Sequence, residues 1–157
     1  MPRPAARPRR PRAMLPAMLL AMLLATLWAL PAAADHDYLG PVTHAPTRKE
    51  CGTCHMAFQP GLLPAASWQR VMAGLDRHFG EDASLPAPVA ADIERYLVTH
   101  AGGRRVDASR DRITEQPWFQ RKHRRITPAT LARPDIRTAS NCTACHPDAE
   151  RGLYDDD

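Results

Sequence analysis

The chain has 157 residues, of which 21 are basic and 17 acidic, and its formal net charge is +4. Five of the arginines lie within residues 3–12, ahead of an apolar run from Ala17 to Leu30 and a small-residue segment that ends at Ala34. This order is typical of an export signal that is cleaved after residue 34. Its removal leaves 16 basic residues against 17 acidic ones, so the basic full chain does not indicate nucleic-acid binding.

An uncleaved membrane anchor is the alternative interpretation of residues 1–34. Counted from Ala13, the apolar stretch reaches 18 residues, which is near the lower limit for spanning a bilayer. Pro16 inside the stretch and the Ala-x-Ala ending favour a cleaved signal peptide. The sequence therefore predicts export to the periplasm, an oxidising space in which cysteines of small proteins commonly form disulfides.

All four cysteines fall in two pentads of the form Cys-x-x-Cys-His, at residues 51–55 and 142–146. Disulfides would leave both histidines unexplained, and a bridge within one pentad would close a very small, strained loop. Cysteines three apart lie about one helical turn from each other, so both sulfurs can form thioethers with the vinyl groups on one edge of a haem. The following histidine can then bind the iron.

The pattern therefore predicts two covalently bound haem c groups. The predicted thioether residues are Cys51, Cys54, Cys142 and Cys145, and the predicted proximal iron ligands are His55 and His146. A structural zinc ion held by the four thiolates is the competing interpretation. Cys54 and Cys142 are 88 positions apart, far more than in a zinc ribbon, and zinc would give no role to the histidines.

Two helices are predicted between the pentads. Apolar residues recur at helical spacing over about 64–79, where Gly80 is the expected stop, and over about 86–100. Ser84 is the expected N-cap of the second helix, and the glycines that follow it are the expected end.

Beyond these helices, residues 102–112 are typical of a linker, and a short helix is predicted over about 117–124. No stretch alternates with the period of a strand, so the fold class is predicted to be mainly α, with short helices and long irregular connections that wrap the haems. We expect an N-terminal haem-binding unit at 35–103 and a C-terminal one at 104–157.

The second axial ligand of each iron decides whether the protein moves electrons or binds a substrate at the metal. Met56 follows His55 too closely to reach the opposite haem face, and Met72 lies on an apolar helix face where methionine is usually core. His78 shares that apolar face, and His123 is aligned with Trp118 and Phe119 ahead of the second pentad. The predicted distal ligands are His78 and His123, and the alternatives are His44, His100 and, near the new N-terminus, His36.

Three runs resemble the small bacterial dihaem cytochrome c family, often abbreviated DHC. They are KECGTCHMAFQPGLLPAASWQRVMAGLDRHFGEDASL, RITEQPWFQRKHR and SNCTACHPDAERG. The resemblance implies a periplasmic electron carrier with low-spin, bis-histidine haems. It also implies a membrane b-type cytochrome as donor and a small oxygen-binding monohaem cytochrome c as acceptor.

The sequence thus predicts an electron-transfer protein rather than an enzyme, and the resemblance implies that its donor is that b-type cytochrome or another quinol-side donor. A haem enzyme or gas-binding protein is the alternative, if one iron lacks its sixth ligand. Residues 104–125 hold eight basic residues against three acidic ones. That segment is either a solvated face, a partner for haem propionates or a docking site for an acidic redox protein.

Overall fold

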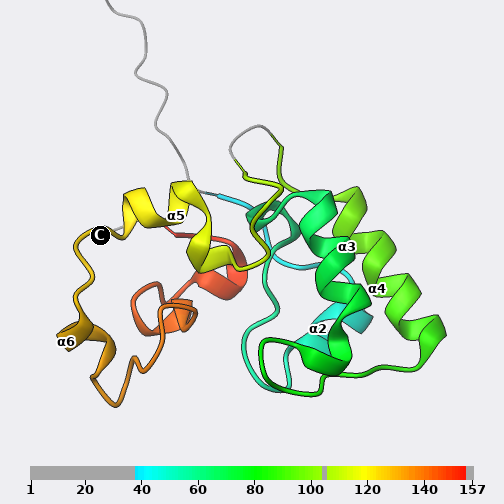
Figure 1. Cartoon of the computed structure of the whole chain (residues 1–157), viewed down its shortest axis with the longest axis horizontal. Coiled ribbons are helices and arrows are strands. Elements are labelled where there is room, and N and C mark those ends of the chain that lie inside the picture. Colours follow the sequence, from blue (N-terminus) through cyan, green and yellow to red (C-terminus); the bar gives the residue numbers. More distant parts are fainter. Residues whose placement is uncertain (1–37, 104–105, 155–157) are drawn as a thin grey trace, which may run out of the picture. The chain divides into compact units, whose positions relative to one another are not determined.

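The computed structural model describes residues 38–103 and 106–154, which belong to one compact unit. The predicted signal peptide at 1–34 and the candidate ligand His36 lie outside the described residues. The helices in this part of the chain are α2 (Ala45–Cys51), α3 (Ala65–Ala73), α4 (Ala87–Thr99), α5 (Pro117–Lys122) and α6 (Pro128–Leu131), joined by single 3-10 turns and irregular segments (Figure 1).

No strand is formed by the described residues, apart from one isolated bridge between His78 and Glu81, which confirms the predicted mainly helical class. None of the helices in residues 38–103 and 106–154 has the length and apolar character needed to cross a bilayer.

Helices α3 and α4 lie side by side and enclose the main hydrophobic core (Figure 1). The buried members of this core are Leu63, Trp68, Met72, Ile93 and Leu97. The Trp68 indole Nε1 donates to the carbonyl oxygen of Pro60 at 2.7 Å, so this large side chain is buried without an unsatisfied polar group. Met72 is also buried in this core, which is the role that its helical spacing predicts.

Several features of the helices differ from the sequence prediction. Helix α3 ends at Ala73, because Gly74 caps it and the chain continues as a separate 3-10 turn up to Arg77. Helix α4 begins after Pro86 and has no side-chain cap, so the predicted N-cap role of Ser84 is wrong. Helix α2 was not predicted, because its sequence has no repeated apolar positions; a proline in its first turn starts it.

The predicted linker is held by buried hydrogen bonds. The Gln116 side chain is fully buried, accepts from the Asp107 N–H at 2.7 Å and donates to the carbonyl oxygens of Asp107 and Arg110 at 3.0 Å. The Ser67 hydroxyl on α3 donates to the same Arg110 carbonyl at 2.6 Å. Residues 106–112 are thereby attached to both α3 and the start of α5.

A second set of bonds joins the two pentad regions. The Gln59 side chain is buried, and its amide donates to the Ala149 carbonyl oxygen at 2.7 Å. The Tyr154 hydroxyl donates to Gln59 Oε1. The Leu39 N–H donates to the Gly152 carbonyl at 2.9 Å. Division of the chain into haem-binding units at residue 104 stays a prediction.

Candidate haem sites

The first pentad begins in the last turn of α2. Cys51 ends this helix and is partly buried, whereas Cys54 is exposed. The Gly52 N–H donates to the Arg48 carbonyl at 3.1 Å, and a Cβ on Gly52 would lie only 2.3 Å from that oxygen. Glycine is therefore required between the two cysteines of this turn. Burial, with a smaller effect of the Glu50 carboxylate, raises the pKa of the Cys51 thiol.

The second pentad forms its own short turn, a 3-10 helix over Cys142–Ala144. The N–H groups of Cys145 and His146 donate to the Cys142 carbonyl at 3.1 and 2.8 Å, which places the two cysteines about one turn apart. Burial also raises the pKa of the Cys142 thiol. None of the four cysteines forms a disulfide.

A second histidine faces the histidine of each pentad. The ring centroids of His55 and His78 are 6.2 Å apart, with an angle of 28° between the ring planes. Those of His123 and His146 are 6.1 Å apart, with an angle of 85°. The sequence singled out these four residues without deciding their pairing. In the structure each distal candidate lies opposite the pentad histidine nearer to it in sequence.

Backbone carbonyls fix the orientation of two of these rings. His55 Nδ1 lies 2.7 Å from the Met56 carbonyl oxygen, and His123 Nδ1 lies 3.0 Å from that of Phe119. A carbonyl oxygen can only accept, so Nδ1 carries the proton and Nε2 keeps a lone pair. This is the usual outer hydrogen bond of a metal-binding histidine.

Aromatic rings hold the histidines in place. Phe58 stacks on His55 with a centroid distance of 4.8 Å, and Phe119 stacks on His123 at 3.9 Å. The Tyr154 ring meets His146 edge-on at 5.6 Å. These contacts limit the rotation of each imidazole, so the rings are oriented by packing as well as by hydrogen bonds.

His78 precedes a turn in which both central residues, Phe79 and Gly80, have positive φ. The turn is closed by the Glu81 N–H, which donates to the His78 carbonyl at 3.1 Å. The Arg112 guanidinium lies 4.2 Å from the centroid of the Phe79 ring, a cation–π contact. Burial, then the nearby His55 and Arg112, lower the pKa of His78 and favour the neutral imidazole that a metal requires.

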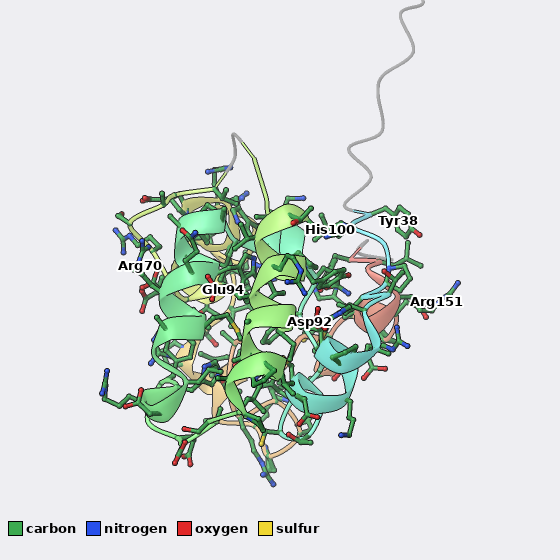
Figure 2. The ribbon with its side chains drawn as sticks, turned by 90° about the vertical axis from the view of Figure 1, so that its right-hand side faces the viewer. Tyr38, Arg70, Asp92, Glu94, His100 and Arg151 are labelled. Atoms are coloured by element: carbon green, nitrogen blue, oxygen red, sulfur yellow. The ribbon has the colours of Figure 1, made fainter. Side chains whose placement is uncertain are left out.

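Two of the alternative ligands, His44 and His100, lie elsewhere, and the ring of each contacts the Tyr96 ring. His44 has both ring nitrogens engaged, Nδ1 with the Thr47 hydroxyl at 2.9 Å and Nε2 with the Asp92 carboxylate at 3.1 Å. His100 lies at the end of α4, and its Nδ1 donates to the Tyr96 carbonyl at 2.9 Å (Figure 2). In the described part of the chain, neither ring is paired with a pentad histidine.

The residues present fit a haem c group at each pentad. Two imidazoles that bind one metal ion from opposite sides, with bonds of about 2 Å each, have ring centroids roughly 6 Å apart. The observed separations of 6.2 and 6.1 Å agree with that spacing. The cysteines of each pentad are free thiols about one turn apart beside each histidine pair, and free thiols are the groups that thioether attachment consumes.

Comparison with known proteins identifies the family. The chain matches the dihaem cytochrome c model over residues 47–154. It is similar to the crystal structure of DHC purified from Rhodobacter sphaeroides, with 49% identity, a TM-score of 0.66, and coverage of 73% of this chain and 99% of that one. It is also similar to a diheme cytochrome c from Shewanella baltica OS155, with 44% identity, a TM-score of 0.64, and coverage of 71% and 86%. No functionally curated protein matches the chain.

The helical fold and the two pentads define a small c-type cytochrome. The chain belongs to the dihaem cytochrome c family. This confirms the resemblance drawn from the sequence and the predicted cofactor, two covalently bound haem c groups. Proteins of this family are in general electron-transfer proteins. The zinc and disulfide interpretations of the cysteines are therefore set aside.

Sequence reasoning missed three residues that shape these sites. Gln59 and Tyr154 join the pentad regions through buried polar contacts, and Arg112 covers Phe79. None belongs to a motif, and their partners are 33 to 95 positions away in sequence. Only one of them had even a weak signal, a glutamine between Phe58 and Pro60.

Proposed function

We propose that the protein is a periplasmic electron carrier in which each iron would have two histidines as its axial ligands. In this proposal Cys51 and Cys54 attach the first haem and Cys142 and Cys145 the second. The axial ligands would be His55 with His78 and His123 with His146. One observation carries the proposal. Beside each pentad, two imidazole rings lie at about the separation expected when both bind the same metal ion.

Haem c supplies one-electron chemistry at its iron. His55 with His78 and His123 with His146 would bind the two irons through nitrogen lone pairs, so an exogenous molecule would have to displace a histidine to reach either metal. Hydrogen bonds from Nδ1 to backbone carbonyls keep the rings of His55 and His123 from turning away. Histidine at both positions, in place of methionine, lowers the reduction potential. We therefore expect both midpoint potentials below those of cytochromes with a His/Met ligand pair.

We further propose export by a cleaved signal at residues 1–34 and a carrier role between a membrane b-type cytochrome, or another quinol-side donor, and a small soluble haem protein. The near-neutral charge of the exported chain and the family membership support this role. A direct test mixes the reduced holoprotein with each candidate partner and follows the rate of haem oxidation or reduction.

Carbon monoxide tests whether each iron has two protein ligands and therefore no free position for an added molecule. Added to the reduced holoprotein, it should leave the absorption spectrum unchanged. His78→Ala and His123→Ala should each open one iron and produce a carbon monoxide complex, whereas the matched controls His44→Ala and His100→Ala should not. Binding by the wild type would contradict the proposal and favour a haem enzyme or gas-binding protein.

A further inference from the structure

Three exposed arginines surround the C-terminal end of α5: Arg121, Arg124 and Arg125, here called the α5 patch. Within the described residues none of them pairs with a carboxylate. Arg121 donates to the Pro117 carbonyl and Arg124 to that of Arg121, both at 3.2 Å. Carbonyl bonds leave the positive charge of a guanidinium uncompensated, so the patch keeps its full charge toward solvent.

Most other arginines of the described chain are neutralised locally. Arg77 pairs with Asp76 at 2.7 Å and Arg151 with Asp148 at 3.1 Å, and the remaining pairs are Arg70–Asp111, Arg95–Asp92, Arg110–Asp107, Arg112–Glu115 and Arg133–Asp135. Arg48 and Arg137 also bond only to carbonyls, but neither has an unpaired basic neighbour in sequence. Among the arginines that the structure describes, clustering without compensation is therefore found only at α5.

The α5 patch adjoins the second iron site. His123 caps α5, and the three arginines lie one or two positions from it in sequence. Its ring is partly buried and faces His146. If His123 is an axial ligand, as the proposed function holds, a molecule bound to the patch lies beside a redox centre.

We propose that the α5 patch is the docking surface for an acidic redox protein that exchanges electrons with the second haem. Uncompensated charge on one face attracts and orients an oppositely charged partner and raises its association rate. In residues 38–103 and 106–154 no comparable cluster adjoins His78, because Arg77 is paired with Asp76 and Arg112 with Glu115. The first haem is therefore the less favourable contact for an acidic partner.

An anionic membrane fits the surface less well. Surfaces that bind anionic membranes often combine basic residues with apolar side chains that insert into the bilayer. Neither aromatic side chain of α5 is fully exposed, since Phe119 is buried and Trp118 is partly buried. The large hydrophobic residues exposed in the described chain are Tyr38, Leu39 and Phe79, all outside α5.

The test compares two triple variants that each remove three positive charges. One is Arg121→Gln/Arg124→Gln/Arg125→Gln. The control is Arg77→Gln/Arg95→Gln/Arg151→Gln, in which every arginine is paired in the wild type. The probe is a gold electrode coated with a carboxylate-terminated monolayer, and the electron-exchange rate of the holoprotein is measured by voltammetry. Measurements at about 0.01 M and about 1 M salt bracket weak and strong screening.

For the wild type, exchange should be fast at low salt and slow at high salt. The patch variant should be slower by roughly tenfold at low salt and nearly insensitive to salt, whereas the control should change less than about twofold. Equal slowing by both variants would overturn the proposal, because net charge alone would explain it. Unchanged haem absorption and near-UV CD check folding, and the single variants Arg124→Gln and Arg125→Gln test the same point in a milder form.

Two other results would also overturn the proposal. A shifted midpoint potential with an unchanged salt dependence would mean that the arginines neutralise a haem propionate. Loss of binding to phosphatidylglycerol vesicles with normal exchange at the electrode would mean a lipid surface. Neither result bears on whether each iron has two histidine ligands, which the carbon monoxide experiment tests separately.

Discussion

Tyr154→Phe removes one hydroxyl from the buried contact that joins the two pentad regions. The hydroxyl donates to Gln59 Oε1, and Gln59 is 1% exposed. Without it the amide oxygen is left buried with no donor, which costs about 1–3 kcal/mol of unfolding free energy. For a domain of this size 1 kcal/mol corresponds to roughly 4 °C in Tm, so we expect a fall of roughly 4–12 °C.

The assay is urea unfolding of the holoprotein in a double-mutant cycle with Gln59→Leu. That single variant should cost more than Tyr154→Phe, because it also removes the 2.7 Å bond to the Ala149 carbonyl. The double variant should then be destabilised by less than the sum, since the two side chains share one bond.

Tyr96→Phe is the matched control, because the Tyr96 hydroxyl accepts a 3.2 Å bond from the Thr43 N–H at an exposed position. It should cost less than about 0.5 kcal/mol. If Tyr154→Phe were no more destabilising than this control, or if the cycle were additive, the reasoning about a buried link between the two pentads would be refuted.

Three further changes have definite expected outcomes. Gly52→Ala places a methyl group 2.3 Å from the Arg48 carbonyl, so mass spectrometry should show protein lacking the first haem; Gly103→Ala, with open space around it, should load normally, and equal loading would contradict the steric argument. Ile93→Ala, at a position with 0% exposure, should lower the free energy of unfolding by about 2–5 kcal/mol in urea, and a loss under about 1 kcal/mol would mean that the core is loose. Gln116→Leu removes the bonds that hold residues 106–112 and should speed limited proteolysis there, which an unchanged cleavage pattern would disprove.

Local sequence signals predicted the helices that have clear start and stop residues. Helix α4 was expected over about 86–100 and occupies Ala87–Thr99, because prolines precede it, glycines follow it and its apolar residues share one face. Helix α3 was predicted too long, since the apolar spacing continues past Gly74 although the helix does not. Helix α2 was missed because its apolar residues do not repeat at helical spacing. Its one buried residue is Thr47, and a single buried position gives no periodic pattern.

For the candidate site, too, the sequence predicted the local features but not those that depend on tertiary structure. Each pentad is a local motif, so its cysteines and histidine could be assigned as candidates from spacing alone. The facing of His55 by His78 and of His146 by His123 depends on tertiary packing and could not be derived from sequence. Evidence against His44 as a ligand came only with the structure, in which Thr47 and Asp92 contact both of its ring nitrogens.

The ligand set of each iron is the most direct test of the account, and a crystal structure of the holoprotein measures it. We predict iron–nitrogen bonds from His55 and His78 at the first haem and from His123 and His146 at the second. A water molecule, Met72, His44 or His100 in any of these four positions would contradict the proposal that the protein carries electrons through two closed, bis-histidine haems.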